Sequence, residues 1–222
     1  MIRVHVICEG QTEEMFVNEI LAEEFRFKGI ELYASLVGKP GHKGGNFKFE
    51  RLLNDVENRL LGDTTAYCTS FYDYYGLPES FPGKIEANNL TNFFDKAKYM
   101  NDTLVEKLTK KLGEKALLRF IPYIQMYEFE ALLFSSPMIL ATSIGSEQNK
   151  EQFQAIRDNF TSPEEINNSP QTAPSKRIEK LCKGYEKVIG GSLAAIDIGL
   201  DEIRNECSLF DAWLTNLENL AK

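Results

Sequence analysis

The sequence has 222 residues, of which 43% are hydrophobic and 26% are charged, with a net charge of −8. These are ordinary values for a globular protein, and no stretch approaches the roughly 18 consecutive apolar residues of a membrane helix. The negative charge argues against non-specific coating of nucleic acid, because such binding needs Lys and Arg to neutralise phosphates. The N-terminus lacks the basic and apolar regions of a signal peptide, so we expect a cytoplasmic protein with no membrane segment.

Strands alternate with helices from the N-terminus onward. Residues 2–8 alternate apolar and polar side chains as a strand does, and Thr12 is the expected N-cap of the helix that follows. Residues 30–37 form a second predicted strand. A Gly- and Lys-rich loop at 38–46 leads into a helix whose apolar face runs through 49–60.

The pattern continues through two more strands. The run at 65–72 is β-branched and aromatic, which predicts a third strand, and a helix is expected over 90–112. A fourth strand is predicted over 117–126, before a helical pattern from Tyr127. Because Pro122 cannot donate to a ladder, this strand should lie at an edge or bulge there.

This alternation predicts right-handed βαβ crossovers, and so an α/β fold with a mainly parallel sheet flanked by helices. From about residue 135 the sequence pattern changes to short helical stretches separated by Gly, Pro and Asn. We therefore expect an α/β domain over 1–134 and a helical C-terminal extension over 135–222 packed on it. The helices expected in the extension cover residues 148–160, 174–182, 193–198 and 209–220.

Three carboxylates follow predicted strands directly. Glu9 comes after the first strand, Asp73 after the third and Glu128 after the fourth. Ligands of open parallel sheets bind at the carboxyl ends of the strands, so all three should face the same edge. Clustered carboxylates need a compensating cation or raised pKa values. The set predicts a site for Mg²⁺ or Mn²⁺, with coordination positions left for a substrate phosphate.

Structural roles compete with this interpretation. Asp73 is also a residue type that caps turns, and Glu13 and Glu14 fall in a first helical turn, where negative charge favours the helix dipole. Glu128 and Glu130 point in different directions, and we prefer Glu128 as the ligand because it lies nearer the strand end.

The Gly- and Lys-rich loop carries positive charge near the predicted site. Lys43, together with Lys39 and Lys48, is predicted to contact substrate phosphate, and the glycines would let backbone N–H groups approach it. An ordinary solvated loop is the alternative.

Several segments together resemble a known family. EGQTE at 9–13, FYDYYGLP at 71–78 and IQMYEFEALLF at 124–134 are similar to an uncharacterised, mostly bacterial family of Toprim-like proteins, the domain of unknown function family numbered 4276. The likeness continues through TAPSKRIEKL, GYEKVIGG and IGLDEIRNECSLFDAWL, and so covers nearly the whole chain.

Toprim domains are the α/β metal modules of topoisomerases, primases and overcoming-lysogenisation-defect nucleases. The resemblance implies that Glu9 acts in acid/base chemistry or metal binding, and that Asp73 is the first half of an Asp-x-Asp that binds Mg²⁺. The second Asp would fall on Tyr75, which cannot replace a carboxylate. Either Glu128 supplies the missing ligand, or the site holds one weakly bound ion.

Two functions of different classes follow from the resemblance. The first is a metal-dependent phosphodiesterase, a nuclease subunit acting on DNA or RNA with an ATPase of the ABC or AAA class in anti-phage defence. The second is a catalytically degenerate binding or adaptor module for that ATPase. Nucleotide hydrolysis is a weaker third hypothesis, and the sequence holds no GxxxxGK[ST] motif that would make this chain the ATPase itself.

Overall fold

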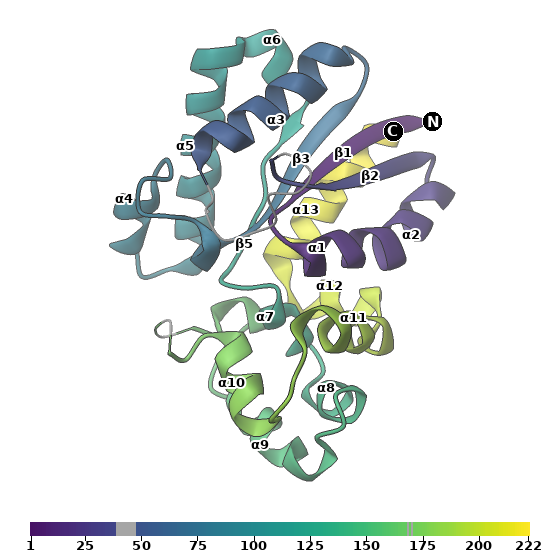
Figure 1. Cartoon of the computed structure of the whole chain (residues 1–222), viewed down its shortest axis with the longest axis vertical. Helices are drawn as coiled ribbons and strands as arrows, with labels where there is room; N and C mark the ends of the chain where they lie inside the picture. The colour runs from purple at the N-terminus through teal and green to yellow at the C-terminus, as the bar shows by residue number, and fades with distance from the viewer. Residues whose placement is uncertain (39–47, 168, 170) are drawn as a thin grey trace. The chain divides into compact units, whose positions relative to one another are not determined.

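The protein's structure, a computed structural model, describes residues 1–38, 48–167, 169 and 171–222 (Figure 1). The chain forms two compact units, the first made of residues 1–124 with 213–222 and the second of residues 125–212. The predicted division into domains at residue 134 stays a prediction. Within the described part of the chain, no helix is both long and apolar enough to cross a membrane.

The first unit is built on a sheet that has five strands in the described residues, in the order β2-β1-β3-β4, with β5 also paired to β3. β1 pairs in parallel with β2 and β3, and β3 pairs in parallel with β4. The predicted α/β fold with a mainly parallel sheet is therefore confirmed. The strands are β1 (Ile2–Cys8), β2 (Ile30–Leu36), β3 (Tyr67–Asp73), β4 (Phe120–Ile121) and β5 (Ile124–Gln125).

The helix after β1 starts earlier than predicted. Gly10 is its N-cap, in an extended conformation, and the carboxylate of Glu13 accepts the Gly10 N–H at 2.9 Å. Thr12 is already inside the helix and buried, so the prediction of Thr12 as N-cap was wrong. The helix runs through α1 (Gln11–Phe16), a π-helical turn (Val17–Leu21) and α2 (Ala22–Phe27).

The predicted fourth strand is broken in two. Leu117 ends a short helix, α6 (Glu114–Leu117), and Pro122 separates β4 from β5. Proline has no N–H to give a ladder, which explains why the pairing is interrupted there. β4 lies at the end of the strand order, as the proline had indicated.

Three further helices belong to the first unit: α3 (Phe49–Gly62), α4 (Lys84–Asn88) and α5 (Phe93–Leu112). α5 begins three residues later than predicted, because the Asn92 side chain accepts the N–H groups of Phe94 and Asp95 and so caps the helix there.

The last helix, α13 (Ser208–Glu218), brings an aromatic side chain back to the first unit. The Trp213 ring stacks on Tyr123 with centroids 4.4 Å apart, and its Nε1–H donates to Thr69 Oγ1 at 2.8 Å. Trp213 is buried, together with Phe210 and Leu217 of the same helix, so these side chains form a core stripe along it.

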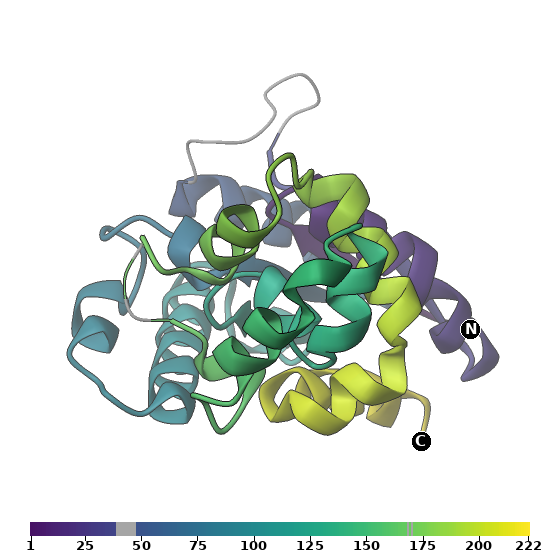
Figure 2. The same ribbon diagram turned by 90° about the horizontal axis from the view of Figure 1, so that it is seen from below.

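The second unit is helical, as expected for the C-terminal part of the chain. Figures 1 and 2 show α8 (Pro137–Ser143) beside α9 (Lys150–Arg157) and α11 (Lys187–Ile198), and α8 packs against both. α11 begins six residues before the predicted start at 193. Gly190 and Gly191 had indicated that no helix would start before residue 193. Gly190 instead lies within α11, where its lack of a side chain makes room for the ring of Tyr185. The unit also contains α7 (Glu130–Leu133), α10 (Pro174–Leu181) and α12 (Leu200–Glu206).

Candidate functional site

Glu9 and Asp73 meet at the carboxyl ends of neighbouring strands. In the parallel pairing of β1 with β3, Cys8 lies opposite Phe71, and the Glu9 N–H donates to the Phe71 carbonyl at 3.1 Å. The Glu9 side chain then reaches across, because its Oε2 accepts the N–H of Asp73 at 3.0 Å. The structure therefore brings these two predicted site residues together at one edge of the sheet. Both are partly buried.

A short 3₁₀ turn, Tyr74–Gly76, follows Asp73 and closes on the Glu9 carboxylate. A Cβ placed on Gly76 would lie 1.9 Å from Glu9 Oε1. Only glycine can occupy position 76 while Glu9 stays where it is. The carboxylate is therefore held on two sides, by the N–H of Asp73 and by the Cα of Gly76.

Glu128 and Glu130 belong to the second unit. Glu128 Oε2 accepts the N–H of Ser175, in the first turn of α10, at 2.9 Å. Glu130 is buried and pairs with Lys187 at 3.2 Å. Burial raises the pKa of Glu130; the Lys187 charge acts to lower it, and the neighbouring Glu128 charge acts to raise it. The place of Glu128 in a set with Glu9 and Asp73 stays a prediction.

The predicted phosphate-binding lysines are described only in part. Lys39 and Lys43 lie outside the described residues. Lys48 is exposed and stands at the N-cap of α3. Tyr75, at the place of the second Asp of an Asp-x-Asp, is partly buried, with its ring centroid 6.3 Å from that of Tyr74.

Two buried lysines at this end of the first unit were not predicted. Lys84 of α4 and Lys96 of α5 both lie against the ring of Tyr74. The spacing of α5 held a signal for Lys96, because it falls on the same helical face as Phe93, three residues before it, and Met100, four residues after it. Nothing comparable in the sequence singled out Lys84.

The donor chemistry of Glu9 and Asp73 fits a hard divalent cation. Across the described ranges, no group of three or more His, Cys, Asp or Glu side chains is arranged to hold a metal. Mg²⁺ does not need such a cage, since it is commonly held by one or two carboxylates, several waters and substrate phosphate. Carboxylate oxygens also suit Mn²⁺. Two carboxylates match the number of protein ligands that Mg²⁺ commonly uses.

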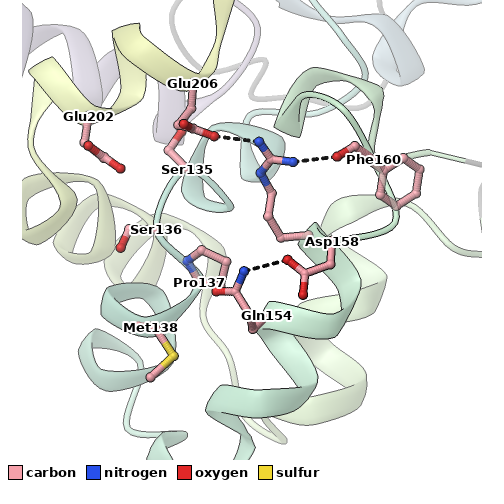
Figure 3. A pocket seen from close by; sticks show the side chains of 10 residues that line it. Ser135, Ser136, Pro137, Met138, Gln154, Asp158, Phe160, Glu202 and Glu206 are labelled. Atoms are coloured by element: carbon pink, nitrogen blue, oxygen red, sulfur yellow. Dashed lines mark hydrogen bonds and ion pairs between the residues drawn. The ribbon is translucent and has the colours of Figure 1, made fainter.

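A pocket of about 540 Å³ opens in the second unit, between residues of α8, α9 and α12 (Figure 3). Arg157 reaches across it to Glu206 at 2.5 Å and to the carbonyl of Phe160 at 2.7 Å, while Gln154 donates to Asp158. The Arg157 guanidinium is therefore already paired. None of the predicted site residues lines this pocket. The Glu9–Asp73 pair therefore remains the candidate site.

Comparison with known proteins gives one family and two structural neighbours. Residues 8–218 match the family described as "Domain of unknown function (DUF4276)". Two solved structures of the C-terminal region of the Xanthomonas campestris pv. campestris OLD protein resemble the chain. The one phased with iodine has 17% identity and a TM-score of 0.37, and covers 97% of this chain and 98% of its own. The one phased with platinum has 16% identity and a TM-score of 0.38, and covers 98% of this chain and 97% of its own. No curated protein matches the chain.

Proposed function

The chain belongs to the family described as Domain of unknown function (DUF4276), and from this premise we propose that it is a Mg²⁺- or Mn²⁺-dependent phosphodiesterase of the Toprim type, acting as a nuclease. The observation that carries the proposal is the contact between Glu9 and Asp73 at the ends of β1 and β3. The two residues meet at the carboxyl edge of a parallel sheet, where α/β proteins bind their ligands.

Each residue has a role in this proposal. Glu9 and Asp73 would hold the ion, with Glu128 as a further ligand, and Glu9 doubles as general base through a water molecule. Lys43, with Lys39 and Lys48, would contact the substrate phosphates. A bound Mg²⁺ or Mn²⁺ supplies a Lewis acid for the phosphoryl oxygens. The Asp73 N–H and the Cα of Gly76 fix the Glu9 carboxylate in one orientation, so its position does not depend on the substrate.

We further propose that the substrate is DNA or RNA, and that the chain works in the cytoplasm with an ATPase of the ABC or AAA class in anti-phage defence. Support for the partner and the setting comes from the family resemblance of the sequence alone.

A non-catalytic adaptor for the same ATPase is the second candidate function. Tyr75, at the place of the second Asp, favours it, because a tyrosine leaves the site one carboxylate short. An adaptor should co-purify with the ATPase and yet show no metal-dependent cleavage in the assembled complex, whereas the nuclease should cleave there.

Calorimetric titration of Mn²⁺ into the full chain tests the proposal. Wild type should show saturable binding, and Asp73→Asn and Glu9→Gln should weaken it at least about tenfold, because each removes a charged ligand. Glu9→Gln keeps an oxygen that can accept the Asp73 N–H, so folding should be preserved. Asp102→Asn, on the exposed side of α5, is the matched control and should bind like wild type. Saturable binding that both site variants retain would refute the assignment of the ligands.

A nuclease assay on single- and double-stranded DNA and RNA, with Mn²⁺ and with the co-purified ATPase, then separates the two functions. Cleavage lost in Glu9→Ala and Asp73→Ala supports the enzyme. Metal binding without cleavage in the complex supports the adaptor.

A further inference from the structure

Two lysines of the first unit are almost completely buried. Lys84 of α4 is 6% exposed and Lys96 of α5 is 8% exposed. Lysine is rarely this buried in proteins unless its charge is paired, since removing an ammonium group from water is costly. Neighbouring groups must therefore compensate the two positive charges of Lys84 and Lys96.

Both ammonium groups gather on the turn that follows Asp73. Nζ of Lys84 lies 3.2 Å from the centroid of the Tyr74 ring, and Nζ of Lys96 lies 5.4 Å from it. Lys84 also donates a hydrogen bond to the Tyr74 carbonyl. An ammonium group has three N–H donors, and the carbonyl takes one of those of Lys84. The residue that carries this double contact is the direct neighbour of Asp73.

The electrostatic environment ties the lysines to the candidate site. The pKa of Lys84 is lowered to about 7, mainly by burial and then by the positive charge of Lys96, while the carboxylates of Glu9 and Glu79 act in the opposite direction. Burial also lowers the pKa of Lys96. The charge of Lys84 therefore interacts with the charges of both Lys96 and the site carboxylate Glu9.

Counting charges shows what a bound metal would change. Glu9, Glu79 and Asp73 place three negative charges at this end of the first unit, against the two ammonium groups of Lys84 and Lys96. A divalent cation on Glu9 and Asp73 would leave this group with surplus positive charge. Such a surplus in a partly buried place attracts an anion, and lysine is a common partner of phosphate.

We propose that Lys84 and Lys96 form an anion subsite beside the Glu9–Asp73 pair, which takes a phosphate group of the substrate when the metal is bound. The inference rests on the proposed function, because the metal supplies the surplus charge. It differs from a purely structural role, in which the lysines would only hold the Tyr74–Gly76 turn. Tyr74 is already tied to α4 by the 2.6 Å hydrogen bond from its hydroxyl to Asn88 Oδ1, so the turn has an anchor that does not need a charge.

The test is calorimetric binding of a dinucleotide whose phosphorothioate linkage resists cleavage, with the full chain, in the presence and absence of Mn²⁺. Lys84→Met and Lys96→Met remove the charge and keep the length of the side chain. Lys98→Met is the matched control, because Lys98 lies on the same helix as Lys96 with its side chain 74% exposed. In Mn²⁺, each of the first two substitutions should weaken dinucleotide binding about tenfold, and the control should not.

Titration of Mn²⁺ alone distinguishes the subsite from a structural role. Removing a positive charge near the carboxylates should leave Mn²⁺ affinity unchanged or make it tighter, whereas a turn that has lost its support should bind Mn²⁺ less well. Weaker Mn²⁺ binding in both variants would overturn the inference. If Lys84→Met does not fold, Lys84→Arg, which keeps the charge, should retain dinucleotide binding while Lys96→Met loses it, and failure of either result would also overturn it.

The two proposals fail in different ways. If wild type binds Mn²⁺ and all three Met variants bind the dinucleotide equally well, the subsite is wrong and the metal site stands. If wild type binds no Mn²⁺ but its dinucleotide binding depends on Lys84 and Lys96, the metal site is wrong, and the lysines bind the anion without the metal, which overturns the metal-dependent subsite. No dinucleotide binding by wild type in Mn²⁺ overturns the subsite.

Discussion

Gly76 lies against the carboxylate of Glu9 so closely that a side chain cannot fit between them. A Cβ at position 76 would stand 1.9 Å from Oε1 and 2.4 Å from the carboxyl carbon of Glu9. The φ of Gly76 is not positive, so the need for glycine is steric rather than conformational. The turn after β3 and the residue after β1 therefore constrain each other, although Gly76 lies 67 positions after Glu9 in the sequence.

We expect Gly76→Ala to displace the Glu9 carboxylate and to weaken Mn²⁺ binding at least about tenfold, measured by calorimetry. Gly62→Ala is the matched control. A Cβ there meets nothing within 4 Å, and alanine is the better helix former at the end of α3, so stability should be kept or rise by up to about 1 kcal/mol with Mn²⁺ affinity unchanged. Wild-type Mn²⁺ affinity in Gly76→Ala would contradict the expectation.

The parallel sheet and the meeting of Glu9 with Asp73 could be predicted from the sequence because both depend on local patterns. Alternating apolar residues placed β1, and a β-branched and aromatic run placed β3. A carboxylate directly after each strand must reach the same edge if the strands are parallel. The close contact with Gly76 could not be predicted, since it depends on how the turn folds back in three dimensions.

Other features escaped sequence reasoning because a side chain acts away from its own position. Glu13 reaches back to cap its helix at Gly10, which moves the start away from Thr12, whose hydroxyl is a common N-cap acceptor. Lys84 and Lys96 were missed because lysine is normally a surface residue, and only packing shows that α4 and α5 bury both on Tyr74.

Thr69→Val tests the hydrogen bond that joins β3 to the last helix. Valine has nearly the shape of threonine but cannot accept the Trp213 Nε1–H, which would be left buried without its acceptor. We expect a loss of about 1–3 kcal/mol in the free energy of unfolding in urea. Trp213 is the single tryptophan of the chain, so its fluorescence should shift in the same variant. Thr64→Val, at an exposed position, should change neither quantity.

Arg119 joins the end of α3 to the start of β3. Its guanidinium donates to the carbonyls of Leu60 and Ala66 at 2.6 Å each, and to that of Asp63 at 2.9 Å. Arg119→Met keeps the aliphatic stem and removes these donors, so unfolding in urea should become easier by about 1–3 kcal/mol. Mn²⁺ affinity should not change.

Lys115→Met, at an exposed position of α6, is the control for Arg119→Met and should unfold like wild type. If the two variants have equal stability, the three carbonyl contacts of Arg119 contribute nothing to it.

Glu164 gives the second unit a stability that depends on pH. Its carboxylate is fully buried and accepts the N–H groups of Leu209 and Phe210 at 2.9 and 3.0 Å. Burial raises the pKa of Glu164 to about 7, although the two N–H groups act to lower it. In the unfolded chain the group titrates near 4.5. Between these values the folded protein keeps a proton that the unfolded chain has released, so stability falls as the pH rises through this range.

We therefore expect wild type to lose about 3 kcal/mol relative to Glu164→Gln between pH 4.5 and pH 7.5, measured by urea unfolding at several pH values. Glutamine stays neutral throughout and keeps an oxygen that can accept one of the two N–H groups. Glu151→Gln, on the exposed face of α9, should follow the wild-type curve. Parallel curves for wild type and Glu164→Gln would show that Glu164 titrates at the same pH in the folded and unfolded chain, because a group with equal pKa values in both states cannot make stability depend on pH.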